Sequence, residues 1–236
     1  MDTPAMAELF QNLTTPHIAD ACLRRGETVR CAPWDLRPLN PSRCWMAGRV
    51  QPARHYGSVD IFLEAMEGAR PGDVLVVDNG GRRDEACVGD LVALEAKAAG
   101  LAAIVIWGLH RDTPEILEIG LPLFSLGACP TGPLRLDQRE AEGLVLARVG
   151  PWAVGPDDVA IGDENGVLFL PAARAAEIAA AARAILETER TQAAKMRQGT
   201  SLRAQLQFSD FMSRRASNPQ LTFRDHLRRI GGAIEE

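Results

Sequence analysis

The feature that most constrains this fold is a strand–helix–strand unit in the middle of the chain. Residues 74–77 form a short apolar run of valine and leucine that ends in Asp78, and residues 102–107 form a second such run. Between them, residues 89–99 have the pattern of a helix that Gly100 closes. Two strands joined by a helix at this spacing pair in parallel through a right-handed crossover. The sequence therefore predicts an α/β fold with a parallel sheet.

Polar residues follow this unit at one edge of the predicted sheet. Open α/β sheets bind ligands beyond the carboxyl ends of their strands. The helix that starts near Gly89 opens at that edge, with Asp90 in its first turn, and Arg111 and Asp112 leave the second strand at the same edge. Arginine suits a carboxylate or an enolate, and aspartate suits Mg²⁺ or Mn²⁺. The alternative is that Asp90 only caps its helix and that Arg111 and Asp112 form a solvated ion pair.

The remaining elements are predicted from apolar periodicity and turn residues. Helices are expected over residues 15–26, 58–68 and 172–198, with a further helical tail after Gly199. Strands are expected over residues 47–51, 123–126 and 144–149, and over 159–162 and 167–170 as a hairpin that turns through residues 163–166.

Composition predicts a cytoplasmic protein that does not enter a membrane. The five cysteines are odd in number and contain no C-x-x-C pair, which is typical of free thiols in a reducing compartment. No apolar run approaches the roughly 20 residues that span a bilayer. The N-terminal segment also lacks the basic and apolar regions of a signal peptide.

Charge is distributed unevenly along the chain. Residues 1–171 hold 15 Lys/Arg and 24 Asp/Glu, whereas residues 172–236 hold 11 Lys/Arg and 7 Asp/Glu. The basic residues of the tail are interleaved with acids, and only Phe208, Phe211 and Phe223 could stack on bases. We therefore expect no nucleic-acid partner, and we expect the tail to dock on the acidic body of its own or a neighbouring subunit.

Several other chemistries are disfavoured. Lys97 and Lys195 are the only lysines and neither follows a strand, so carbonyl chemistry is expected to use a metal rather than a Schiff base. Residues 110–112 spell the kinase tripeptide, but Leu117 stands where a kinase has asparagine. His17, His55 and His226 lack zinc spacing, Asp163 is expected to be a turn residue, and His110 is expected near the pocket.

Five stretches together carry a resemblance to a known family. They are residues 71–78, Gly89 with Asp90, Gly108 with Arg111 and Asp112, residues 122–124, and residues 156–167. The chain resembles, over roughly residues 12–190, the family that joins the regulator of ribonuclease E activity (RraA) to the class II pyruvate aldolases. Those aldolases act on 4-hydroxy-4-methyl-2-oxoglutarate and 4-carboxy-4-hydroxy-2-oxoadipate. The most specific element is an aspartate followed 21 and 22 residues later by Arg-Asp.

This resemblance implies a swivelling β/β/α fold that assembles as trimers or hexamers with active sites between subunits. We expect residues 1–170 to form the catalytic domain. Residues 171–236 are expected to form a C-terminal helical arm that packs on a neighbouring subunit. The segment beyond Gly199 does not match the aldolases, so the rim of the pocket is expected to differ from theirs.

The resemblance also implies roles for the charged residues. Asp112 would bind the divalent metal, Mg²⁺ or Mn²⁺. Arg111 would contact the oxo-acid oxygen, and Asp90 would hold a metal-bound water.

The remaining implied contacts come from a helix start and from a second subunit. Backbone amides near Gly89, Leu91 and Val92 would receive the substrate carboxylate. A glutamate from a neighbouring subunit's C-terminal helix would order metal-bound water, and Glu187 matches it best by position, ahead of Glu189.

The expected function is a metal-dependent aldolase that cleaves a 4-hydroxy-2-oxo acid to pyruvate and also decarboxylates oxaloacetate. One alternative is a non-catalytic RraA-type regulator that binds a ribonuclease or another protein. Regulatory relatives tend to lose the metal-binding aspartate, whereas this chain keeps Asp112. A metal-dependent enzyme acting on a sugar-derived oxo acid is a third possibility. Methyltransferase activity is disfavoured, because residues 79–81 make a poor cofactor-binding loop.

Overall fold

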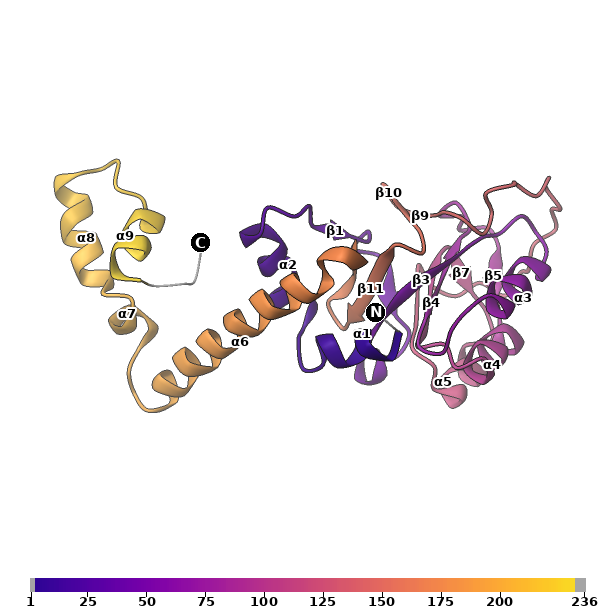
Figure 1. The fold of residues 1–236 in the computed structure, drawn as a ribbon, viewed down its shortest axis with the longest axis horizontal. Coiled ribbons are helices and arrows are strands. Elements are labelled where there is room, and N and C mark those ends of the chain that lie inside the picture. Colours follow the sequence, from indigo (N-terminus) through magenta and orange to yellow (C-terminus); the bar gives the residue numbers. More distant parts are fainter. Residues whose placement is uncertain (1–2, 232–236) are drawn as a thin grey trace.

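The computed structural model describes residues 3–231 of the 236-residue chain. Its centre is an eight-stranded mixed sheet (Figure 1). In spatial order the strands are β1 (Arg30–Cys31), β12 (Gly166–Pro171), β11 (Asp158–Asp163), β3 (Met46–Arg54), β4 (Val74–Asp78), β6 (Ala103–Trp107), β8 (Leu123–Ser125) and β2 (Arg37–Pro38).

The parallel part of the sheet contains the strand–helix–strand unit that the sequence predicts. Strands β3, β4, β6 and β8 run parallel, and α3 (Asp60–Glu67), α4 (Asp90–Ala98) and α5 (Thr113–Ile119) connect them. Every residue of β4 is buried. Leu75 and Val77 face the core beneath the helices, while Val74 and Val76 face the core on the opposite side. A strand covered on both faces reads as a continuous apolar run, which is why this unit is visible in the sequence.

Three layers confirm the swivelling β/β/α architecture. Helices α3, α4 and α5 cover one face of the parallel strands, and the hairpin of β9 (Ala147–Val149) and β10 (Trp152–Val154) packs against the other. The antiparallel strands β11 and β12 are covered by α1 (Thr3–Phe10), α2 (Thr15–Arg24) and the first half of α6 (Ala175–Arg197). The predicted hairpin of residues 159–170 is confirmed as β11 and β12.

The C-terminal helices lead away from the sheet (Figure 1). Burial along α6 ends at Ile185, and α7 (Leu202–Gln205), α8 (Phe208–Ser217) and α9 (Phe223–Ile230) gather beyond its far end. Phe208, Phe211 and Phe223 pack on one another and on buried His226, with ring centroids 5.0–5.8 Å apart. These rings therefore form the small core of the tail.

One predicted strand is wrong in its first half. Residues 144–146 do not join a sheet, because the amides of Val145 and Leu146 both bond back to the carbonyl of Glu142 as a turn. Only Ala147–Val149 forms the strand β9. The predicted helix over residues 172–198 is confirmed as a short 3₁₀ turn, Ala172–Arg174, followed by α6.

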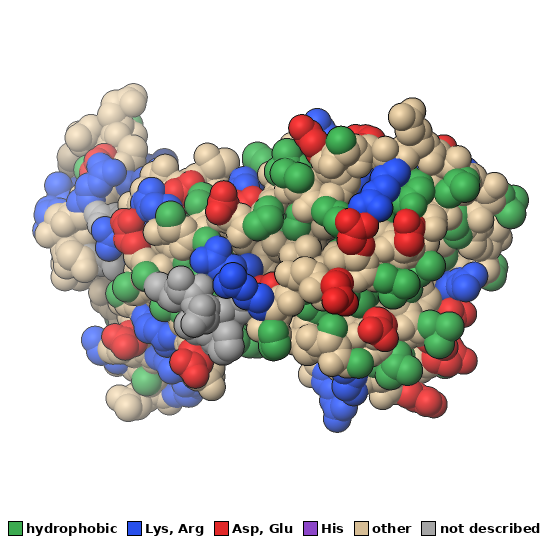
Figure 2. All heavy atoms as spheres, turned by 45° about the vertical axis from the view of Figure 1, so that its right-hand side comes forward, with side chains coloured by type: hydrophobic (Ala, Val, Ile, Leu, Met, Phe, Trp, Pro, Cys, Tyr) green, Lys and Arg blue, Asp and Glu red, His purple; other side chains and the backbone are tan. Residues whose placement is uncertain are grey.

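The surface carries mixed charge. On the face that Figure 2 shows, acidic and basic side chains are interspersed with apolar ones rather than gathered in one patch. Across residues 3–231, no helix has both the length and the apolar character needed to cross a membrane.

Candidate active site

A small strand pair builds the candidate site. Strand β5 (Ala86–Val88) pairs in parallel with β7 (Leu109–His110), and Val88 stands opposite His110 in the register. The amide of Arg111 continues this pairing by donating to the carbonyl of Val88, 2.9 Å away. The residues that follow the two strands therefore come to lie side by side.

The structure brings together Asp90, Arg111 and Asp112 as the sequence predicts. Arg111 Nε lies 3.3 Å from Asp112 Oδ2, and the same oxygen accepts a hydrogen bond of 3.4 Å from the amide of Asp90. The amide of Leu91 donates to Asp90 Oδ1 at 2.8 Å. Both amides belong to the first turn of α4, where unpaired N–H groups and the helix dipole favour negative charge. The cluster is thus a cation beside two carboxylates at a helix N-terminus.

Gly89 leaves the space in which these groups meet. It is the N-cap of α4. A Cβ atom at this position would collide with the Asp112 carboxylate and would lie 3.2 Å from Arg111 Nε. Only glycine allows the start of the helix to approach both side chains so closely.

Asp112 itself is held in an uncommon conformation. Its φ of 60° and ψ of 45° are left-handed, and it is the N-cap of α5. Buried His110 joins the surrounding segments, since its Nδ1 lies 2.8 Å from Ser125 Oγ and its Nε2 lies 3.0 Å from Thr113 Oγ1. Burial lowers the pKa of His110, which favours the neutral ring in this bridge. His110 is buried beside the candidate site, with both ring nitrogens in contact with hydroxyl groups.

The donor set fits a hydrated divalent cation. Within the described part of the chain, no group of three or more His, Cys, Asp or Glu side chains could hold a metal ion. Mg²⁺ commonly binds one or two carboxylates and keeps several of its waters. Asp112, with 36% of its side chain exposed, offers one hard carboxylate that could hold such an ion, and the amide of Asp90 lies beside it.

The other predicted site residues have different positions. Leu91 is 75% exposed on the rim of the helix start, whereas Val92 is buried below it. Glu187 is exposed on α6 and lines a cavity of about 910 Å³ between that helix and the tail. Glu189 contacts His17 at 3.1 Å. Helix α6 lies on the other side of the molecule from α4 and α5 (Figure 1), so one subunit alone does not bring Glu187 to Asp112.

Two further residues that the sequence singled out have structural partners. Buried Asp163 accepts hydrogen bonds from the amide and hydroxyl of Thr15, each at 2.7 Å, and from the amide of Asn165 at 2.8 Å. It therefore joins the β11–β12 turn to the start of α2. His226 is buried in the tail, where its Nε2 donates to the carbonyl of Leu206 at 2.8 Å.

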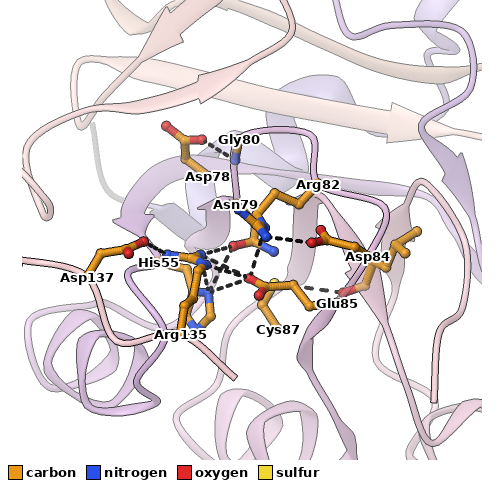
Figure 3. A network of polar contacts seen from close by, with 11 residues as sticks. His55, Asp78, Asn79, Gly80, Arg82, Asp84, Glu85, Cys87, Arg135 and Asp137 are labelled. Carbon is orange, nitrogen blue, oxygen red and sulfur yellow. Dashed lines mark hydrogen bonds and ion pairs between the residues drawn. The ribbon is translucent and has the colours of Figure 1, made fainter. Parts of the chain in front are cut away.

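A second polar cluster was missed by sequence reasoning. His55, Asn79, Glu85 and Arg135 converge from four separate segments (Figure 3). No spacing pattern relates these positions, and the one available signal was that Asn79 directly follows a buried strand, where ligand-binding residues of α/β proteins lie.

Comparisons with known proteins show which family this chain resembles. A protein-family model described as "RraA-like: Aldolase/RraA" matches residues 15–169. The chain is 33% identical over 129 residues to the 4-hydroxy-4-methyl-2-oxoglutarate aldolase of Thermus thermophilus, and the match covers 55% of this chain and 77% of that protein.

Solved structures show the same fold. RraAS2 of Streptomyces coelicolor, described as an unusual member of the RNase ES inhibitor RraA family, superposes with a TM-score of 0.70 at 23% identity, covering 80% of this chain and 96% of that one. The RNA-processing inhibitor RraA from Thermus thermophilis superposes with a TM-score of 0.55 at 29% identity, covering 64% and 90%. The family match includes the segments that hold Asp90, Arg111 and Asp112. This chain therefore belongs to the RraA-like family.

Proposed function

We propose that this protein is a divalent-metal-dependent aldolase that cleaves a 4-hydroxy-2-oxo acid to pyruvate. The observation that carries the proposal is the meeting of Asp112, Arg111 and the N-terminus of α4 at one edge of the sheet. A metal ligand, a fixed cation and an anion-binding helix end are the three groups that such a substrate requires. The aldolase name of the Thermus thermophilus relative supports the same reaction.

The helix start is suited to hold the substrate's carboxylate. The amides of Asp90 and Leu91 already donate to carboxylate oxygens of Asp112 and Asp90. In the proposed complex the amides of residues 89–92 receive the carboxylate next to the 2-oxo group. This orients the oxo oxygen toward Arg111, whose planar guanidinium suits an oxygen that gains negative charge.

Asp112 would hold the Mg²⁺ or Mn²⁺ ion, which when bound supplies Lewis-acid polarisation of the oxo group. Asp90 positions the water that takes the proton from the C4 hydroxyl. The C3–C4 bond then breaks, its electrons form the enolate of pyruvate, and the C4 hydroxyl becomes a carbonyl on the second product. Arg111 stabilises the enolate oxygen until C3 is protonated. Oxaloacetate gives the same enolate by losing carbon dioxide, so we propose that the site also decarboxylates it.

We also propose that the active site is completed by a second subunit in a trimer or hexamer. Asp112 and Arg111 are both partly exposed, which leaves room for a neighbour. Glu187 is exposed, and its side chain has no hydrogen-bond or ion-pair partner within the described residues. In the proposed assembly, Glu187 of one subunit would order the water that Asp90 of the neighbouring subunit holds.

Pyruvate release tests the proposal. The purified protein is incubated with 4-hydroxy-4-methyl-2-oxoglutarate or oxaloacetate, with Mg²⁺, with Mn²⁺ or with a chelator. We expect release with either metal and none with the chelator. Release from neither substrate under any condition would contradict the proposed reaction.

A protein-binding regulator is the second candidate. It is favoured by the structural likeness to the RNA-processing inhibitor RraA. Binding of a ribonuclease by a protein that turns over neither oxo acid would support this candidate over the aldolase.

A further inference from the structure

A second cleft lies at the carboxyl edge of the sheet and contains none of the residues of the candidate active site. It has a volume of about 430 Å³ and is lined by the ends of β3 and β4 with the residues that follow them, by the loop after β8, and by β9. Its lining includes four arginines, which are Arg54, Arg82, Arg135 and Arg148. Two carboxylates, Asp78 and Glu140, also line it. We call it the arginine cleft.

A buried network fixes the amide of Asn79 in the wall of this cleft (Figure 3). Its Oδ1 accepts hydrogen bonds from Arg135 Nη2 at 2.8 Å and His55 Nδ1 at 2.9 Å. Arg135 Nε in turn donates to Glu85 Oε1 at 3.0 Å. Because two donors occupy the amide oxygen, the orientation of the Asn79 amide is settled, and its nitrogen must find an acceptor elsewhere.

That acceptor is missing. Among the side chains of residues 6–231, three buried nitrogen or oxygen atoms have no hydrogen-bond partner, namely Asn79 Nδ2, Arg54 Nε and Arg82 Nε. All three belong to residues that line the arginine cleft, and all three are donors. Arg54 Nε does lie 3.3 Å from a carboxylate oxygen of Asp78, and Arg82 Nε lies 3.5 Å from one of Glu85. Neither pair has the alignment of a hydrogen bond.

We propose that the arginine cleft binds a small oxyanion, a carboxylate or a phosphate, through Arg54, Arg82 and Asn79. Buried donors that make no hydrogen bond call for an acceptor, and a group of oxygen atoms with negative charge satisfies several at once. Because guanidinium groups carry positive charge, the arginine cleft is not suited to a metal cation. The proposal rests on this cleft alone and does not depend on the proposed aldolase reaction.

The cleft is separate from the candidate active site. None of the residues that line the arginine cleft belongs to the cluster of Asp90, Arg111 and Asp112. We infer that the cleft ligand is a second molecule rather than part of the substrate, and the Asp112→Ala variant below tests this.

Glu140 is the exposed group with which the ligand competes for Arg54. Its carboxylate, 59% exposed, forms an ion pair with Arg54 at the cleft. An incoming oxyanion takes this place beside Arg54 and releases Glu140 to solvent. Removing the charge of Glu140 should therefore strengthen binding, whereas removing Arg82 should weaken it.

Isothermal titration calorimetry with inorganic phosphate and with malonate, at constant ionic strength, tests the proposal. We expect one site per chain for at least one of the two anions, and the preferred anion identifies the ligand class. Arg82→Ala should weaken its binding at least tenfold, and Glu140→Gln should tighten it at least threefold. Glu140→Gln changes only an exposed side chain, so its effect does not depend on a variant that risks misfolding.

Matched variants separate a specific site from a general charge effect. Arg139→Ala removes an exposed arginine that pairs with Glu64 on α3, and Glu142→Gln removes an exposed charge from the same loop as Glu140. Both should bind as the unchanged protein does, and so should Asp112→Ala, which alters only the candidate active site. Absence of binding by the unchanged protein overturns the proposal, as does equal weakening by Arg82→Ala and Arg139→Ala. Loss of binding in Asp112→Ala would place the anion in the active site and overturns it too.

Discussion

At the scale of single residues, the backbone of Asp112 explains how its carboxylate reaches α4. The left-handed conformation costs a non-glycine residue free energy, although aspartate tolerates it better than most. In this conformation the carboxylate accepts a hydrogen bond from the amide of Asp90. His110 and Thr113, which flank Arg111 and Asp112 in the sequence, contact each other, and His110 also contacts Ser125. The position of the proposed metal ligand is thus fixed by its neighbours.

Arg111→Lys should lower kcat for pyruvate release by about 10²-fold or more, because a point charge cannot replace the planar donor fork beside the enolate oxygen. Steady-state kinetics with saturating Mg²⁺ measures this effect. Arg139→Lys, the same change on an exposed arginine of the protein surface, should leave kcat unchanged. Normal kinetics in Arg111→Lys would remove Arg111 from the mechanism.

Gly89→Ala should weaken Mg²⁺ binding on the order of tenfold, since the new methyl group displaces the Asp112 carboxylate from its place at the helix start. Metal titration followed by activity or calorimetry gives the affinity. Gly68→Ala is the matched control, because a Cβ there meets nothing closer than 3.8 Å. Unchanged metal affinity in Gly89→Ala would show that Asp112 is not the ligand.

His55 should make the protein less stable in mild acid. Burial lowers its pKa below the ordinary 6.5, and Arg135 lowers it further, against the hydrogen bond to Asn79 and the charge of Glu85. Below about pH 6.5 the unfolded chain binds a proton that the folded chain rejects, so the free energy of unfolding falls as the pH falls. Urea unfolding between pH 5 and 8 measures this slope, and His55→Asn should reduce it. An equal slope in the variant would contradict this assignment.

The sequence predicted the meeting of Asp90, Arg111 and Asp112 because each follows or starts a strongly patterned element. It could not predict the cluster of His55, Asn79, Glu85 and Arg135. These residues come from segments up to 80 positions apart, and no motif relates their side chains. Only the folded sheet edge brings them together.

At the scale of elements, long apolar runs were predictable and two- or three-residue strands were not. Strand β6 reads as a strand because both of its faces are buried. Strands β5 and β7 have three and two residues, which is too few for any periodicity. Yet this pair places Gly89 beside Arg111. The sequence therefore predicted which side chains meet but not the pairing that aligns them.

Asp163→Ala should destabilise the fold by about 2–4 kcal/mol, because it leaves the buried amide and hydroxyl of Thr15 without their acceptor. The junction between α2 and the β11–β12 turn would be lost with it. Denaturant unfolding measures the change. Glu164→Ala, an exposed residue of the same turn, should change stability little. Equal stability of both variants would contradict this role.

At the scale of the whole molecule, the position of the C-terminal helical arm bears on whether one subunit alone forms a complete active site. The second half of α6 leads away from its own sheet, and Glu187 lies on that helix (Figure 1). If Glu187 acts in a neighbour's site, Asp112→Ala and Glu187→Ala should each be inactive alone. Subunits of the two variants that are unfolded and refolded together at equal amounts should recover activity at about a quarter of their sites, by random assembly. No recovery would place Glu187 outside the neighbouring site.

The most direct test of the central claim is pyruvate release from 4-hydroxy-4-methyl-2-oxoglutarate by Asp112→Asn, measured with Mg²⁺ and with a chelator. Asparagine keeps the size of the side chain and removes the charge that binds the ion. Asp35→Asn, which alters an aspartate paired with Arg83 elsewhere on the surface, is the control. We expect the unchanged protein and the control to release pyruvate only with Mg²⁺, and Asp112→Asn to release none. Mg²⁺-dependent release by Asp112→Asn at the unchanged rate would contradict a metal-dependent aldolase site at Asp112.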